Sequence, residues 1–112
     1  MLASCSTLEK DPTVGWSVER LYQEARDEMN NLQYEKAIKL FEKLEGRAAG
    51  TPLAQQAQLE KAYAYYKNKD NALAIGTLDR FIKVHPASPA LDYALYLKGV
   101  VNFNDEIGRA HV

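Results

Sequence analysis

Residues 34–44, YEKAIKLFEKL, have a residue pattern that recurs thirty-seven positions later in residues 71–81, NALAIGTLDRF. Both stretches have alanine at their fourth position and bulky apolar side chains at their eighth and eleventh positions. Ala25 and Ala62 show the same spacing, and Gly99 lies a further thirty-seven residues along the chain. A period of this length is typical of a solenoid of helical hairpins. The small residues fit such a fold, because two helices pack closely only where one of them offers alanine or glycine.

The sequence therefore predicts an all-α fold, a tetratricopeptide-like α-solenoid of helical hairpins. The two quoted stretches resemble the second helix of a tetratricopeptide repeat, and Pro86 is expected to close the later one. The residues expected at close helix crossings are Ala25, Ala37, Ala62, Ala74 and Gly99.

Turn and capping signals divide the body of the chain into hairpins. We expect repeat 1 at 17–51, repeat 2 at 52–88 and the first helix of repeat 3 at 89–105. Ser17 is predicted to cap the first helix and Asp70 the fourth. In the fifth helix, the residues expected to face inward are Leu91, Leu95 and Val100.

The last segment, 106–112, reads EIGRAHV and resembles the translation of a common short sequencing adapter. It also departs from the repeat, because Gly108 is expected to interrupt a helix that should continue. The alternative is a native loop that opens after Asp105. We expect 106–112 to be a sequencing-adapter artefact and the natural protein to continue well past Asp105, so no fold or site prediction rests on these residues.

The first residues, Leu2-Ala3-Ser4-Cys5, resemble a bacterial lipobox. Residues 1–4 would be the remnant of a lipoprotein signal peptide, and 5–16 a lipidated tether with Cys5 as the lipid attachment site. Each buried CH₂ of an acyl chain contributes about 0.8 kcal/mol, so a multiply acylated cysteine anchors firmly. Ser6 follows the cysteine, which favours the periplasmic face of the outer membrane over retention at the inner membrane. The alternative is an ordinary exposed cysteine near the terminus.

Composition narrows the possible functions. The chain has 112 residues, a net charge of −1 with interspersed signs, and one cysteine. No cluster of basic residues indicates nucleic-acid binding, and a single cysteine cannot form an internal disulfide. No nucleotide-binding, zinc-protease or cysteine–histidine motif is present, so the chain is predicted to be no enzyme, with no catalytic residues, no metal and no cofactor.

Aromatic side chains are the best candidates for a binding role. The first helix of each hairpin lines the concave side of such a solenoid, where extended partners dock. Tyrosine offers contact area together with a hydroxyl, and it is enriched in binding surfaces. The alternatives are that the rings are interhelix core and that the two cations are simply solvated. The residues predicted to bind a peptide or partner are Tyr63, Tyr66, Arg80, Tyr93, Tyr96 and Lys98.

Three segments carry a more specific resemblance: YAYYK at 63–67, DRFI at 79–82, and HPASPALDY at 85–93. Together with the lipobox and the tether, they are similar to the BamD family, the lipoprotein subunits of the β-barrel assembly machine in the outer membrane of Gram-negative bacteria. The likeness covers about residues 5–105.

This resemblance implies a lipid-anchored subunit of the outer-membrane assembly and insertion machinery. The implied partners are the barrel subunit, the other lipoproteins of the machine, and the C-terminal segments of unfolded outer-membrane proteins. The N-terminal repeats, which this chain carries, are the part implied to receive those segments.

A second class of function remains open, a different periplasmic tetratricopeptide scaffold of the cell envelope, such as a division coordinator of the Tol–Pal type. A complete lipoprotein signal upstream would favour the first class, and a plain secretory signal would favour the second.

Overall fold

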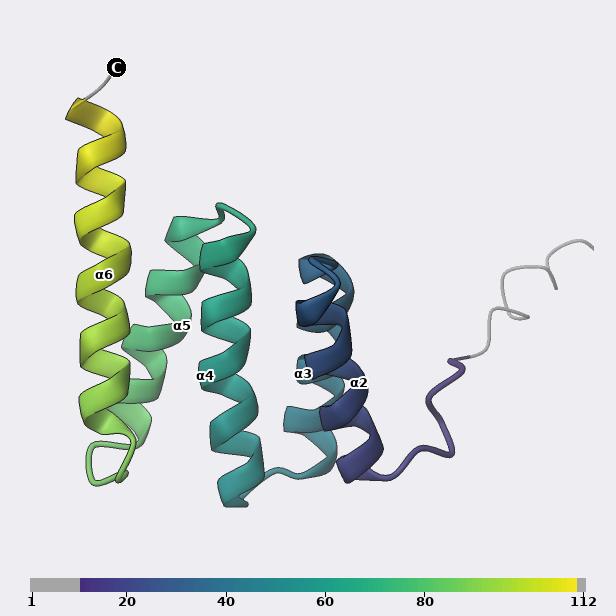
Figure 1. Cartoon of the computed structure of the whole chain (residues 1–112). Coiled ribbons are helices and arrows are strands. Elements are labelled where there is room, and N and C mark those ends of the chain that lie inside the picture. The colour runs from purple at the N-terminus through teal and green to yellow at the C-terminus, as the bar shows by residue number, and fades with distance from the viewer. Residues whose placement is uncertain (1–10, 111–112) are drawn as a thin grey trace, which may run out of the picture.

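The structure, a computed structural model, describes residues 11–110. Over this range the chain is helical with no strand (Figure 1), which confirms the predicted all-α fold. None of these helices is both long enough and apolar enough to cross a membrane. The helices are α2 (Val18–Asn30), α3 (Tyr34–Arg47), α4 (Pro52–Lys67), α5 (Asn71–Val84) and α6 (Leu91–Ala110).

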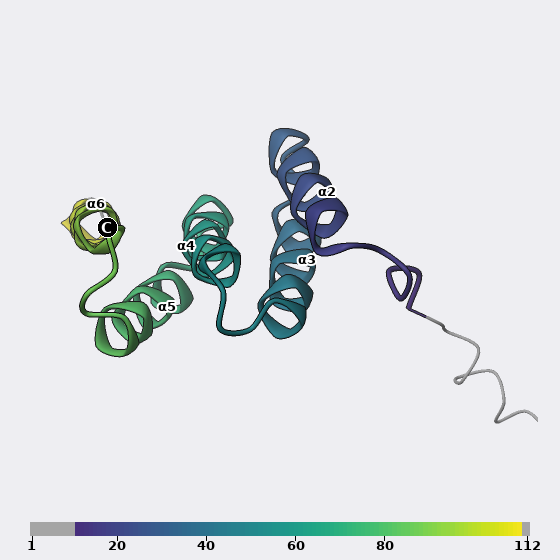
Figure 2. The same ribbon diagram turned by 90° about the horizontal axis from the view of Figure 1, so that it is seen from below.

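The helices are arranged as hairpins in a row. α2 packs on α3 and α4 on α5, and α3 and α5 in turn pack on the helices that follow them, α4 and α6. Figure 2 shows α2, α4 and α6 along one side and α3 and α5 along the other. α4 also contacts α6 directly. The first helices of the hairpins therefore share one surface and the second helices share the opposite one.

Four of the predicted crossing residues, Ala25, Ala37, Ala62 and Ala74, are completely buried. They lie in two successive cores, each built around the large side chains that the repeat places between them. The first core comprises Leu21, Ala25, Ala37, Phe41, Leu44, Ala48 and Ala57. The second comprises Leu59, Ala62, Ala74, Leu78, Phe81, Ala94, Leu97 and Val101.

The thirty-seven-residue register also governs contacts between hairpins. Ala57 lies on α4 but belongs to the core of the preceding hairpin, whereas Leu59 and Ala62 face the core of their own hairpin. Ala94, thirty-seven residues after Ala57, joins the preceding core from α6 in the same way. A first helix thus has one face for the hairpin before it and another for its own second helix.

The inward residues of α6 differ from the prediction. Leu95, expected inside, is 49% exposed, and α6 instead buries Ala94, Leu97 and Val101. Gly99 is also exposed, and a Cβ built on it would meet nothing within 4 Å, so the predicted close crossing at Gly99 is wrong for this structure. The reason is the position of Gly99 in the repeat. It corresponds to Ala62, which lies on the face of α4 that packs on α5. No helix among residues 11–110 covers the equivalent face of α6.

The ends of α6 also differ. The helix begins at Leu91 rather than at Pro89, and it continues through Gly108 to Ala110. Glycine costs about 1 kcal/mol in a helix interior relative to alanine, which is too little to end a long helix by itself. The expectation that Gly108 interrupts the helix is therefore wrong.

Two helices begin at a side chain that accepts a hydrogen bond. The Ser17 hydroxyl accepts a bond from the Arg20 amide at 3.1 Å, as predicted. Thr51, which was not predicted, caps α4 in the same way. Asp70 precedes α5 but makes no side-chain cap. Its backbone lacks the extended conformation that Ser17 and Thr51 share, and its carboxylate accepts a bond from the Asn68 amide group at 3.0 Å.

We expect Ala37→Leu and Ala74→Leu each to lower the free energy of unfolding by roughly 1–3 kcal/mol, because extra methylenes overpack a filled crossing. Urea denaturation followed by circular dichroism measures this. Gly76→Ala in the same helix as Ala74 is the matched control: nothing lies within 4 Å of its added Cβ, so stability should rise by up to about 1 kcal/mol. Unchanged stability in both leucine variants would contradict the register.

Candidate peptide-binding surface

Two of the predicted tyrosines, Tyr63 and Tyr93, lie on the surface shared by the first helices. Tyr63 on α4 is 37% exposed, and Tyr93 on α6 is 45% exposed. Burial is the largest cause that raises the pKa of the Tyr93 hydroxyl, and the neighbouring Tyr63, Glu60 and Tyr96 raise it further. Tyr63 and Tyr93 therefore form an aromatic surface across the junction between α4 and α6.

Tyr66 has a structural role at the same junction. Its ring is half-buried against the second core, with its centroid 6.2 Å from that of Tyr63. Its hydroxyl accepts a bond from the Asn104 side chain of α6 at 2.5 Å. The geometry of Tyr66 therefore fits the alternative, a ring packed between helices, better than it fits an exposed binding ring.

Tyr96 is the most exposed of the four tyrosines, at 68%. It lies thirty-seven residues after Leu59, which is 2% exposed and packs within its own hairpin. In the preceding hairpin, α5 covers the equivalent position on α4. No helix within residues 11–110 covers Tyr96 in that way.

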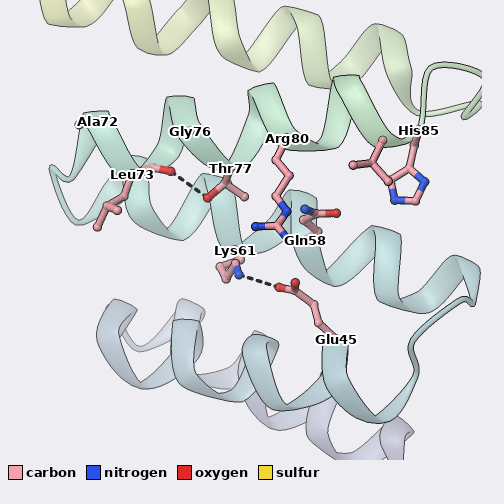
Figure 3. Close-up of a pocket in the computed structure, with 10 residues that line it drawn as sticks. Glu45, Gln58, Lys61, Ala72, Leu73, Gly76, Thr77, Arg80 and His85 are labelled. Atoms are coloured by element: carbon pink, nitrogen blue, oxygen red, sulfur yellow. Dashed lines mark hydrogen bonds and ion pairs between the residues drawn. The ribbon is translucent and has the colours of Figure 1, made fainter.

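The structure does not bring the two predicted cations to the tyrosines. Lys98 pairs with Asp79 of α5, with 2.6 Å between Nζ and Oδ1. Lys61, thirty-seven residues earlier, pairs in the same way with Glu45 of α3 at 2.9 Å. These lysines therefore join a first helix to the preceding hairpin. Arg80 lies on α5 and lines a separate hollow that includes none of the four tyrosines (Figure 3).

A polar network beside Tyr63 was not predicted from the sequence. The Tyr22 hydroxyl of α2 donates to the Glu60 carboxylate of α4 at 2.5 Å, and the Gln56 amide donates to the same carboxylate at 2.9 Å. Arg26 donates to the Tyr22 hydroxyl at 3.1 Å and lies 3.6 Å from Glu60. The network ties α2 to α4 and places the Arg26 guanidinium beside Glu60, which lies one helical turn from Tyr63 on α4.

Burial is also the largest cause that raises the pKa of Tyr22, followed by its bond to Glu60. The bond from Arg26 acts in the opposite direction. No local motif marks this network, because Tyr22 and Glu60 are thirty-eight residues apart. Only the repeat register, which places α2 beside α4, would have pointed to it.

The end of the predicted tether packs on α3. Lys43 donates to the Asp11 carboxylate at 2.5 Å, and Arg47 donates to the Trp16 carbonyl at 2.9 Å. Thr13, between them, is only 3% exposed. The bond from Lys43, followed by those from Thr13, holds the pKa of Asp11 far below its ordinary value. Residues 11–16 are therefore docked, while the predicted lipid attachment site, Cys5, lies outside the described residues.

Among residues 11–110, no group of three or more histidine, cysteine, aspartate or glutamate side chains is arranged to hold a metal. The surface built by α2, α4 and α6 instead offers aromatic rings, amides and one ion pair, which are groups that bind chain segments. The fold defines a helical-repeat protein, and this surface is its candidate binding site.

Comparison with known proteins places the chain more closely. A family model described as outer membrane lipoprotein, YfiO, matches residues 16–110, and the chain belongs to this family. The chain is 48% identical over 110 residues to the outer membrane protein assembly factor BamD of Neisseria meningitidis serogroup B, covering 94% of this chain and 41% of that protein.

More distant relatives have the same name. The chain is 33% identical to BamD of Vibrio cholerae, with 82% of this chain and 38% of the relative covered. It is 31% identical to BamD of Caulobacter vibrioides, with 91% and 34% covered. The chain thus spans about two fifths or less of the length of these relatives, and the BamD resemblance seen in the sequence is confirmed.

We expect Glu60→Gln to lower the free energy of unfolding by roughly 1 kcal/mol, because the hydrogen bond from Tyr22 and the ion pair with Arg26 lose their charged partner. The pKa of Tyr22 should fall in this variant, because the bond to Glu60 raises it and the bond from Arg26, which lowers it, remains. Urea denaturation and an NMR titration of the Tyr22 ring measure the two effects.

Glu24→Gln is the matched control, since Glu24 lies in the middle of α2 and makes no ion pair within residues 11–110. Equal losses of stability in the two variants, or an unmoved Tyr22 pKa, would show that the network does not bind α2 to α4.

Proposed function

We propose that this chain is part of a lipid-anchored factor that assists the assembly and insertion of β-barrel proteins in the outer membrane. The observation that supports it is family membership along nearly the whole body of the chain, together with 48% identity to a relative named as an outer membrane protein assembly factor. Because the chain spans only part of that relative, the role of the whole protein is inferred.

The finer proposal concerns the aromatic surface of Tyr63 and Tyr93. An extended segment laid along α4 and α6 would place alternate side chains against the two rings. Its backbone would meet the tyrosine hydroxyls and the amide of Gln56. We propose that this segment is the C-terminal end of an unfolded barrel protein, which has apolar residues at alternate positions and ends in an aromatic residue. We assign its terminal carboxylate to Arg26, since Arg80 and Lys98 lie elsewhere.

The proposed partners follow from the family. We propose that the whole factor is held at the periplasmic face of the outer membrane through lipid on Cys5, and that it contacts the barrel subunit and other lipoproteins of the assembly machine. The exposed face of α6, with Tyr96, Gly99 and Phe103, is available to further helices of a longer chain. The other class, a periplasmic scaffold of the Tol–Pal type, is disfavoured by the family match.

The test of the finer proposal is a titration of the purified chain with a labelled peptide of alternating apolar residues that ends in phenylalanine. Tyr63→Ala and Tyr93→Ala should each weaken binding by about 1–2 kcal/mol, because a ring in a peptide-binding surface acts as a hot spot. Fluorescence anisotropy measures the affinity, and melting curves check that each variant stays folded.

Leu95→Ala is the matched control, because Leu95 is 49% exposed on α6 and points away from Tyr93. Its affinity should equal that of the wild type. The surface is ruled out if the wild type ignores the peptide, or if affinity falls only in step with the melting temperature.

For the anchor, we expect the full-length precursor to incorporate a fatty-acid analogue in a Gram-negative host and to lose all labelling in Cys5→Ala. The physical reason is that the thiol of Cys5 and the amine released by signal cleavage are the groups that carry lipid. Labelling that persists in Cys5→Ala would show attachment at another residue.

A further inference from the structure

A hollow of about 530 Å³ lies between α3 and α5, with α4 as its floor (Figure 3). None of the four predicted tyrosines lines it. Arg80 and Thr77 of α5 form one wall, Glu45 of α3 forms the other, and Gln58 and Lys61 of α4 lie between them. The volume falls within the range of about 300–1,000 Å³ that is typical of ligand sites.

One of the charged side chains in this hollow has no ion-pair partner among residues 11–110. Glu45 is paired with Lys61 at 2.9 Å. Arg80 is exposed and forms no ion pair with any residue between 11 and 110. Two apolar side chains of α5 flank it, Leu73 and Val84, which are 54% and 58% exposed. The hollow therefore presents one unpaired guanidinium between two apolar ends.

The chain itself shows what a cation at this position binds. Lys43 precedes Arg80 by thirty-seven residues, and it binds the Asp11 carboxylate of the N-terminal segment that runs over α3. The residue thirty-seven positions after Asp11 is Ala48. The second hairpin thus repeats the cation but lacks the carboxylate that satisfies it in the first.

We propose that the hollow binds an acidic, extended segment of a partner protein, with an aspartate or glutamate of that segment on Arg80 and apolar neighbours on Leu73 and Val84. Guanidinium and carboxylate form paired, charge-assisted hydrogen bonds, which suit a single recognised side chain. The docked segment 11–16 is the model for such an occupant, because it is a non-helical stretch that meets its cation through one carboxylate.

The same features disfavour an anionic membrane surface as the occupant. Lipid surfaces are recognised by clusters of about four to eight lysine and arginine residues. Here a single unpaired arginine shares its hollow with the Glu45 carboxylate, so a dense layer of anions would meet repulsion as well as attraction.

The test uses the purified chain and a fluorescein-labelled heptapeptide that alternates aspartate and leucine. Anisotropy should report saturable binding that weakens at least fivefold in Arg80→Gln. Arg80→Lys should weaken binding less than Arg80→Gln, because it keeps the charge but loses the paired hydrogen bonds of the guanidinium. An otherwise identical peptide with asparagine in place of aspartate should bind the wild type at least fivefold more weakly. Melting temperatures should not change, since Arg80 is exposed and unpaired in the described chain.

Two control variants test whether the peptide binds in the hollow itself. Lys83→Gln removes an exposed cation of α5 that does not line the hollow, and Tyr63→Ala alters the aromatic surface, which does not line it either; both should bind like the wild type. Equal weakening in Lys83→Gln would overturn the proposal in favour of diffuse attraction. It also fails if Arg80→Gln reduces binding to phosphatidylglycerol vesicles and leaves peptide binding unchanged.

Discussion

Close contact between helices at alanine is the constraint on which this molecule depends. Ala25 and Ala37 in the first hairpin, and Ala62 and Ala74 in the second, have no exposed surface at all. Where the backbones approach this closely, the large side chains on either side, such as Phe41 and Phe81, fill the rest of the core. Because the same pattern returns after thirty-seven residues, it also sets how each hairpin meets the next and which face of each first helix remains exposed.

Much of this could be predicted, because helix periodicity and small residues are local signals. The repeat register has consequences beyond the ones predicted from it. It places Lys61 and Lys98 at equivalent positions, where each forms an ion pair with the second helix of the preceding hairpin. The predicted binding role of Lys98 stays a prediction. The contact between Tyr22 and Glu60 was missed because it joins helices thirty-eight residues apart and leaves no local pattern.

The errors have physical causes of the same kind. Gly99 follows the repeat, but a crossing needs a second helix, and the described chain provides none at that face. Asp70 is correctly placed to cap α5, but its backbone is not in the extended conformation that a capping side chain needs, which propensity alone does not reveal. The tyrosines differ in role for a similar reason, because Tyr66 finds a partner in Asn104 and Tyr63 keeps its exposed edge.

The docking of residues 11–16 on α3 has a mechanical consequence. If lipid is attached at Cys5, the six peptide units from Cys5 to Asp11 are the whole length of chain between the bilayer and the folded body. Fully extended, they reach roughly 20 Å. Under that attachment, the contacts of Lys43 and Arg47 with residues 11–16 would keep the first hairpin within that distance of the membrane and would restrict its orientation relative to the bilayer.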